Sequence, residues 1–112
     1  MRRGDIVIVS TSGDYGKPRP AVVVQTNALP GDYPSIILCP ITSDMSGLSF
    51  RIAVRPDREN GLKLQSQIMT DKIIGVPRGK IGKKIGRLGE DEMRDLNMAL
   101  TFLLGLAASE NP

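Results

Sequence analysis

The sequence has 112 residues, of which 40% are hydrophobic and 24% are charged, and its formal net charge is +3. This length and composition predict one compact soluble domain spanning residues 1–112. No stretch approaches the roughly 18 consecutive apolar residues that cross a bilayer. Histidine is absent, which excludes Ser-His-Asp or Cys-His catalysis and any His-ligated metal. The single cysteine, Cys39, excludes an internal disulfide and predicts a reducing, cytoplasmic compartment.

Positive charge is concentrated in the second half of the chain. Between residues 61 and 88, the single acid Asp71 stands against seven cations: Lys63, Lys72, Arg78, Lys80, Lys83, Lys84 and Arg87. From residue 89 onward the sign reverses, with five acids against Arg94: Glu90, Asp91, Glu92, Asp95 and Glu110. A basic block of this kind is typical either of a phosphate-facing surface or of a solvated loop, and charge alone favours the solvated loop.

In chain order, the sequence first predicts a series of short strands. Residues 5–10, 20–27 and 35–42 are rich in valine and isoleucine, and residues 50–56 alternate between apolar and polar side chains. Pro40 cannot donate to a strand ladder, so we expect it at an edge or a bulge. Asn60-Gly61 indicates a turn. Residues 62–77 predict one bent strand or two short ones, and residues 78–88 predict a helical turn followed by a short strand.

The last element changes to helical spacing, with apolar residues at positions 93, 96, 100, 103, 104 and 107. Three acids at positions 90–92 suit the positive end of a helix dipole, and Gly89 is the expected cap. The second half of this helix is apolar on nearly every face, so we expect part of it to contact another subunit. Together the elements predict a mainly β fold: a strongly bent antiparallel sheet or small, SH3-like, partly open barrel with a C-terminal α-helix.

Arg19 lies between two prolines in the sequence KPRP, directly before the apolar run AVVV. Each proline fixes its own φ and biases the residue before it to an extended conformation, so the backbone around Arg19 is stiff. A stiff backbone suits a guanidinium that binds two phosphate oxygens in fixed geometry. The tetrapeptide alone favours the simpler interpretation, in which it is a rigid strand start with a solvent-facing arginine.

Two further segments contain candidate polar side chains. PITSD places Thr42, Ser43 and Asp44 where the third predicted strand opens into a loop, which is typical of a reactive rim or of a turn stabilised by its own side chains. In QSQIMTD, Gln67 and Asp71 have groups that can read the base edges of a single-stranded nucleic acid, although an exposed strand face is the commoner case. The carboxylates are scattered, and their spacing predicts no metal cluster.

Taken together, the order and spacing of these segments resemble one known family. RRGDIVIV, KPRPAVVVQ, ILCPITSD and NGLKLQSQIMTDKI, followed by an amphipathic C-terminal helix, are similar to the MazF/PemK/Kid toxins of bacterial toxin–antitoxin systems. The resemblance covers nearly the whole chain. It implies an SH3-like barrel, a homodimer and a cognate MazE-like antitoxin. It also implies sequence-specific cleavage of single-stranded RNA, often mRNA, with no metal or other cofactor.

The resemblance also implies roles for individual residues. Arg19 matches the arginine of the family's RP motif, an acid/base group and phosphate ligand, and Thr42 matches the threonine that stabilises charge on the phosphate. Residues implied in RNA binding are Lys17, Ser43, Gln67 and Asp71. The loop from Tyr15 to Lys17 is expected to border the RNA groove. Many relatives have an arginine two positions after the glutamine; here that position is Met69, and Asp71 falls one place early.

Two other classes of function remain as alternatives. A CcdB-like gyrase poison would share the fold and cleave nothing, but such proteins rely on a C-terminal Trp-Gly-Ile, and this chain has no tryptophan. A non-enzymatic SH3-like binding module would present an aromatic groove to proline-rich ligands. The sequence offers only two tyrosines and two phenylalanines for such a groove.

Overall fold

Seven short strands and one α-helix form the regular structure of residues 1–10 and 17–106, the parts of the chain that the computed structural model describes. The strands are β1 (Asp5–Ser10), β2 (Pro18–Val23), β3 (Ser35–Thr42), β4 (Ile52–Val54), β5 (Ser66–Ile68), β6 (Ile74–Pro77) and β7 (Ile81–Arg87). Two 3₁₀ turns, η2 (Thr70–Lys72) and η3 (Arg78–Lys80), flank β6, and the helix α1 spans Glu90–Leu103.

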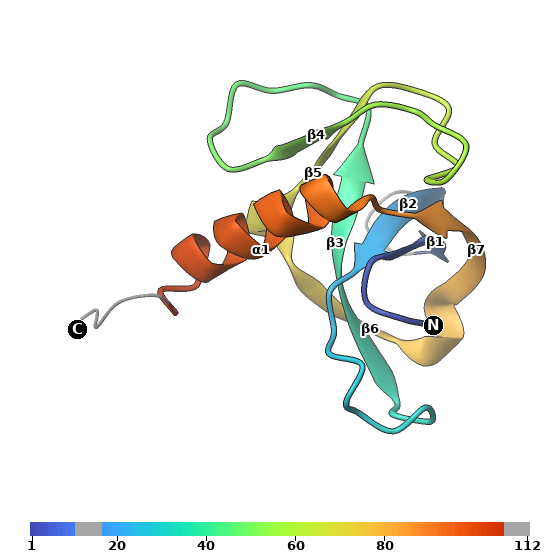
Figure 1. Ribbon diagram of the computed structural model, residues 1–112. Helices are drawn as coiled ribbons and strands as arrows, with labels where there is room; N and C mark the ends of the chain where they lie inside the picture. The colour runs from blue at the N-terminus through green and yellow to red at the C-terminus, as the bar shows by residue number, and fades with distance from the viewer. Residues whose placement is uncertain (11–16, 107–112) are drawn as a thin grey trace.

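All strand pairs are antiparallel, in the order β4-β5-β3-β2-β1-β7, with β6 also pairing with β3. The sheet bends strongly but does not close, because β4 and β7 lie at its two ends. In Figure 1, α1 crosses the sheet in front of β3, with β4 and β5 above it and β6 below. The prediction of a bent antiparallel sheet with a C-terminal helix is therefore confirmed.

Pro40 lies in the interior of the central strand β3, where the prediction of an edge position is wrong. On one side of β3, residues 35–38 pair with β6 and residues 41–42 pair with β5. Pro40 occupies the gap between these two partners, so its missing N–H costs no ladder bond there. The proline thus marks the point at which β3 exchanges one neighbouring strand for another.

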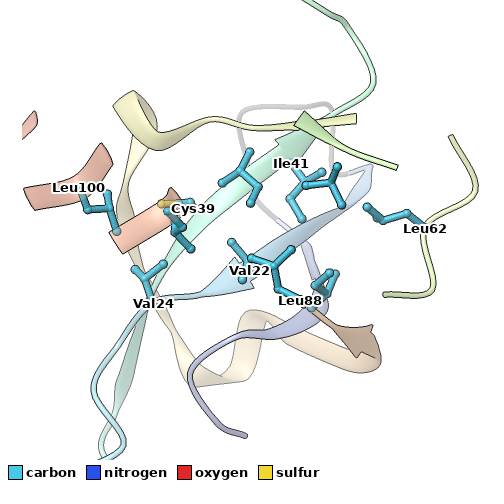
Figure 2. Close-up of a cluster of buried hydrophobic side chains, with 11 residues drawn as sticks. Val22, Val24, Cys39, Ile41, Leu62, Leu88 and Leu100 are labelled. Carbon is cyan, nitrogen blue, oxygen red and sulfur yellow. The ribbon is translucent and has the colours of Figure 1, made fainter. Parts of the chain in front are cut away.

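Two apolar clusters pack against the sheet. The larger one lies between the sheet and α1, and in Figure 2 Leu100 of the helix lies beside Cys39 of β3, while Ile41 lies farther along β3, towards Leu62. The smaller one combines alternate residues of β1, β2 and β3 with β6: Val7, Val9, Ala21, Val23, Ile36, Leu38 and Val76. Because successive side chains of a strand point to opposite faces, both faces of β2 are buried, as its run of valines predicted.

Most predicted boundaries agree with the structure. β1 and β3 match, residues 62–77 form two short strands, a 3₁₀ turn precedes β7, and Gly89 caps α1. β2 ends four residues early because the N–H groups of Val24 and Gln25 both donate to the carbonyl of Ile37, which interrupts the ladder. β4 is shorter than predicted at both ends, and at its start the positive φ of Phe50, 70°, interrupts the extended backbone. Position 107 lies outside the described residues.

Candidate active site

Arg19 and Thr42 come from the facing ends of β2 and β3. In this strand pair the ladder ends where Ala21 is opposite Pro40, and Arg19 and Thr42 each lie two residues beyond that pair on their own strands. Both side chains line one groove of about 1160 Å³. The two residues predicted to act on phosphate are therefore brought together by the pairing of two strands.

The lining of this groove is rich in positive charge. Among the described residues it contains five cations, Arg19, Arg51, Lys63, Lys72 and Lys83, and one carboxylate, Asp44. Cations gathered along one concave surface attract a polyanion and hold its phosphates. Only part of the basic block predicted from the sequence contributes to this groove: Lys63, Lys72 and Lys83 line it. Arg78 instead donates to the carbonyl of Tyr33. Lys84 and Arg87 pair with Asp5.

Thr42 is held at the rim of the groove by its own loop. Its Oγ1 accepts a hydrogen bond of 3.0 Å from the backbone N–H of Asp44. A hydroxyl has one proton to donate and two acceptor positions, so this bond fixes the oxygen and leaves the proton for a ligand. Ser43 and Asp44 are exposed and line the groove beside it. The local turn and a ligand-binding role for Thr42 are therefore compatible.

The other predicted RNA-binding residues, Lys17, Gln67 and Asp71, do not line the groove. Lys17 is exposed directly before β2, while Tyr15 and Gly16 of the same predicted loop lie outside the described residues. Gln67 is buried in β5, next to Thr42 in the ladder, and its amide bonds to Ser46. Asp71 is exposed in η2, where hydrogen bonds from Arg51 hold the pKa of its carboxyl below the ordinary value.

Arg51 is a groove residue that the sequence pattern missed. The alternation of residues 50–56 predicts Arg51 on an exposed face, yet only 8% of its side chain is accessible. Its partner Asp71 is twenty positions away, so no local pattern could reveal the pair. The sequence signal for the pair is weak: Asp71 is the single acid between residues 61 and 88, which does not identify Arg51 as its partner.

Metal-binding groups do not gather in the described parts of the chain, where no three Asp, Glu, Cys or His residues could hold one ion. Cys39 is fully buried in the core, and burial raises the pKa of its thiol to about 12. Within residues 1–10 and 17–106, no helix is long and apolar enough to span a membrane.

Comparison with known proteins gives matches over nearly the whole chain. A relative from Mycolicibacterium smegmatis, called a probable endoribonuclease MazF, is 36% identical over 108 residues, which are 96% of this chain and 99% of the relative. The Mycobacterium tuberculosis toxin MazF-mt6 has a similar structure, with a TM-score of 0.79 at 24% identity, covering 93% of this chain and 99% of that one.

A MazE–MazF structure from Deinococcus radiodurans gives the same TM-score of 0.79 at 22% identity, over 96% of this chain and 97% of that one. These structural likenesses show the fold, in agreement with the bent sheet and terminal helix. The model of one protein family, described as PemK-like, MazF-like toxin of type II toxin–antitoxin system, matches residues 2–104. This chain therefore belongs to the PemK-like, MazF-like toxins of type II toxin–antitoxin systems.

Proposed function

We propose that this chain is a toxin that cleaves single-stranded RNA, as a single domain, at a groove containing Arg19 and Thr42. The observation that carries the proposal is that these two side chains line one basic groove from opposing strands. The M. smegmatis relative is called an endoribonuclease, which supports the same reaction class here. A gyrase poison or a peptide-binding module would not need a phosphate ligand at this position.

The proposed reaction uses a nucleophile that the substrate supplies. The ribose 2′-oxygen bonds to the adjacent phosphorus while the bond from phosphorus to the 5′-oxygen breaks. The 2′-hydroxyl loses one proton to water, and the 5′-oxygen gains one from Arg19, which regains a proton from water. The products are a 2′,3′-cyclic phosphate and a 5′-hydroxyl end. No protein nucleophile or metal is required, and a chain without histidine can catalyse this step.

The protein's part is to bind the charge that develops on the phosphate. Arginine stays protonated at neutral pH, so Arg19 donates to two phosphate oxygens with its fork and is the acid placed near the leaving group. The Thr42 hydroxyl adds a third donor. Fixed donors aimed at developing charge are often the largest contribution to catalysis. Pro18 and Pro20 stiffen the backbone that carries Arg19, so little conformational entropy of this backbone is lost when RNA binds.

RNA binding is proposed to extend beyond these two residues. Lys17 precedes the strand that carries Arg19, and Ser43 follows Thr42 on the exposed rim of the groove. Gln67 and Asp71 contribute indirectly, through their bonds to Ser46 and Arg51 behind this rim. The toxin is expected to act in the bacterial cytoplasm, because its RNA substrate is there.

Two protein partners belong to the proposal. A second copy of the chain would cover the exposed apolar side chains near the end of α1, giving a homodimer. A cognate MazE-like antitoxin would place an acidic segment over the groove and the basic stretch from Arg78 to Arg87. The structures of relatives solved with antitoxins, one mycobacterial and one from D. radiodurans, support this second partner.

The test incubates the purified protein with a long RNA of mixed sequence and maps the new ends. We expect cyclic phosphate and 5′-hydroxyl ends, unchanged by excess chelator, while DNA of the same sequence stays intact. Arg19→Ala should lower the cleavage rate by roughly 100-fold or more, as is typical when one transition-state donor is lost.

The matched control is Arg58→Ala, which removes an exposed arginine that does not line the groove. It should cleave at the wild-type rate, and both variants should melt at the wild-type temperature. Full activity of folded Arg19→Ala would contradict the assignment of this site. Loss of cleavage in chelator with recovery on adding metal would contradict the proposed chemistry.

A further inference from the structure

The loop that follows β3, residues 43–50, is tied back to the strand beside Thr42; we call it the rim loop. Gln67 makes the first tie. Its Oε1 accepts from the N–H and the hydroxyl of Ser46, at 3.2 and 3.3 Å, and its Nε2 donates to the Ser46 carbonyl at 2.8 Å. Gln67 pairs with Thr42 in the ladder. The middle of the rim loop is therefore fixed to the strand position next to Thr42.

Arg51 and Asp71 make the second tie, at the far end of the rim loop. Arg51 donates twice to the carboxylate, with Nε–Oδ1 at 2.9 Å and Nη2–Oδ2 at 3.2 Å, and its Nη1 lies 3.4 Å from the Ser46 hydroxyl. Two parallel bonds from a planar guanidinium fix its orientation as well as its position. Arg51 also lines the groove, so its bonds to Asp71 fix one side chain of the groove wall.

A third tie holds the last residue of the rim loop in an uncommon conformation. Phe50 has a φ of 70°, the one positive value among the non-glycine residues that the structure describes. Bulky residues adopt such values only where their surroundings impose them. Here the Thr70 hydroxyl donates to the Phe50 carbonyl at 2.6 Å. Residues 67–71 thus contribute a side chain to all three ties.

We propose that Gln67, Thr70 and the Arg51–Asp71 pair are positioning residues that fix the rim loop beside Thr42 and so determine which RNA sequences the groove accepts. This inference rests on the proposed RNA cleavage. The rim loop presents exposed side chains next to the site, among them Ser43, Met45 and Leu48. A fixed loop offers one contact surface to the bases, whereas a loose loop offers many and selects poorly.

Direct reading of bases by Gln67 and Asp71 is the competing role. Gln67 is buried, and its carbonyl and amide groups are both bonded to Ser46. For Gln67 or Asp71 to bind a base, these bonds to Ser46 or Arg51 would have to break. The two roles differ in one consequence. If the ion pair only positions the loop, the acid and the base can exchange positions and the pair still forms; if the Asp71 carboxylate reads a base, the exchange removes that contact.

The first experiment compares Gln67→Ala with Gln65→Ala, which removes an exposed glutamine two positions earlier. Cleavage of a mixed-sequence RNA is mapped, and kcat/KM is measured on the wild-type's preferred sequence. Gln67→Ala should lower kcat/KM there at least tenfold and add cuts at sequences that the wild type ignores. Gln65→Ala should keep the wild-type rate and pattern.

The second experiment exchanges the ion pair. Asp71→Asn keeps the shape of an exposed side chain and should broaden the cleavage pattern, as Gln67→Ala does. Asp71→Arg alone should do so more strongly, and the double variant Arg51→Asp, Asp71→Arg should restore part of the wild-type selectivity. The matched control is Asp91→Asn, which breaks the exposed pair with Arg94 on α1 and should leave the pattern unchanged.

Amide hydrogen exchange of Ser46 separates this inference from the proposed function, because it needs no RNA. The Ser46 N–H should exchange at least tenfold faster in Gln67→Ala and Asp71→Asn than in the wild type or the controls. If exchange accelerates but no form of the protein cleaves RNA, the ties stand and the proposed function fails. If the wild type cleaves, and both folded variants keep its exchange rate and its cleavage pattern, the positioning role is overturned.

Discussion

At the scale of single residues, one buried carboxylate ties the first strand to the last. Asp5 begins β1, its side chain is 3% exposed, and its Oδ1 lies 3.0 Å from Nη1 of Arg87 and 3.3 Å from Nζ of Lys84. Its Oδ2 accepts from the Arg2 N–H at 2.8 Å. Burial alone raises the pKa of this carboxyl, but the Arg2 bond and the two cations outweigh burial and lower the net pKa.

We expect Asp5→Asn to lower the free energy of unfolding at pH 7 by about 1–3 kcal/mol, because the hydrogen bonds of a buried charge are lost. A carboxyl whose folded pKa is depressed contributes stability above its unfolded pKa, about 3.9, and loses it as pH falls through the folded pKa. The difference between wild type and variant should therefore shrink below about pH 4. Urea unfolding at pH 7 and pH 3 measures both values.

Asp91→Asn is the control for this prediction, since the Asp91–Arg94 pair is exposed on α1. Exposed pairs contribute little, so this variant should match the wild type within about 0.5 kcal/mol at either pH. An Asp5→Asn variant as stable as the wild type at pH 7, or equally destabilised at pH 3, would show that the carboxylate is not paired as described.

Single residues also show what the sequence could predict at the site. The stiffness around Arg19 depends on its two neighbouring prolines, so a tetrapeptide is enough to indicate it. The burial of Cys39 follows from its place in an apolar strand. The environment of Arg51 depends on Asp71 and on a loop folded back by Gln67, which are contacts between separate elements. Local patterns contain no information on such contacts.

At the scale of elements, the turn before residue 62 packs directly on β7. Asn60 is buried, and its Oδ1 accepts from the N–H groups of Asp57 and Leu62 while its Nδ2 donates to the Arg55 carbonyl. The Arg87 N–H donates to the Glu59 carbonyl at 2.7 Å. The turn and β7 approach so closely that their backbones touch at Gly86.

Gly86→Ala should therefore destabilise the protein by about 1–3 kcal/mol or more, as overpacking does. The added methyl group would meet the backbone of Glu59 and Asn60, which cannot move aside as a flexible side chain could. Gly75→Ala in β6 is the matched control, because a methyl group there meets nothing within 4 Å. Thermal melting compares the two, and equal melting temperatures would contradict this packing.

Elements also differ in how far the sequence determines their limits. The start of α1 was predictable because Gly89 and the acids after it act within one turn. The end of β2 was not, because Ile37 of another strand accepts two N–H groups from it. Pro40 was misplaced for the same reason: its position makes sense only once β5 and β6 are known to share one edge of β3.

At the scale of the whole molecule, α1 uses only part of its apolar surface to cover the sheet. Leu96, Ala99 and Leu100 form the buried face of α1, whereas Met98 is 67% exposed and Phe102 is 60% exposed. The ring of Phe102 stacks on Phe50 of the rim loop, with centroids 4.5 Å apart. Leu104 and Leu106 continue the exposed apolar surface past the end of the helix. Large contiguous apolar patches of this kind are typical of protein interfaces.

If a second copy covers this surface, Met98→Glu should convert a dimer into a monomer, because a charge would be buried between two apolar faces. Sedimentation velocity at micromolar concentration measures the shift, and we expect at least tenfold weaker association. Tyr33→Glu is the control, since it adds the same charge at an exposed aromatic residue between β2 and β3. It should remain dimeric. A wild type that sediments as a monomer, or a Met98→Glu variant that stays dimeric, would mean that the apolar end of α1 serves a different partner.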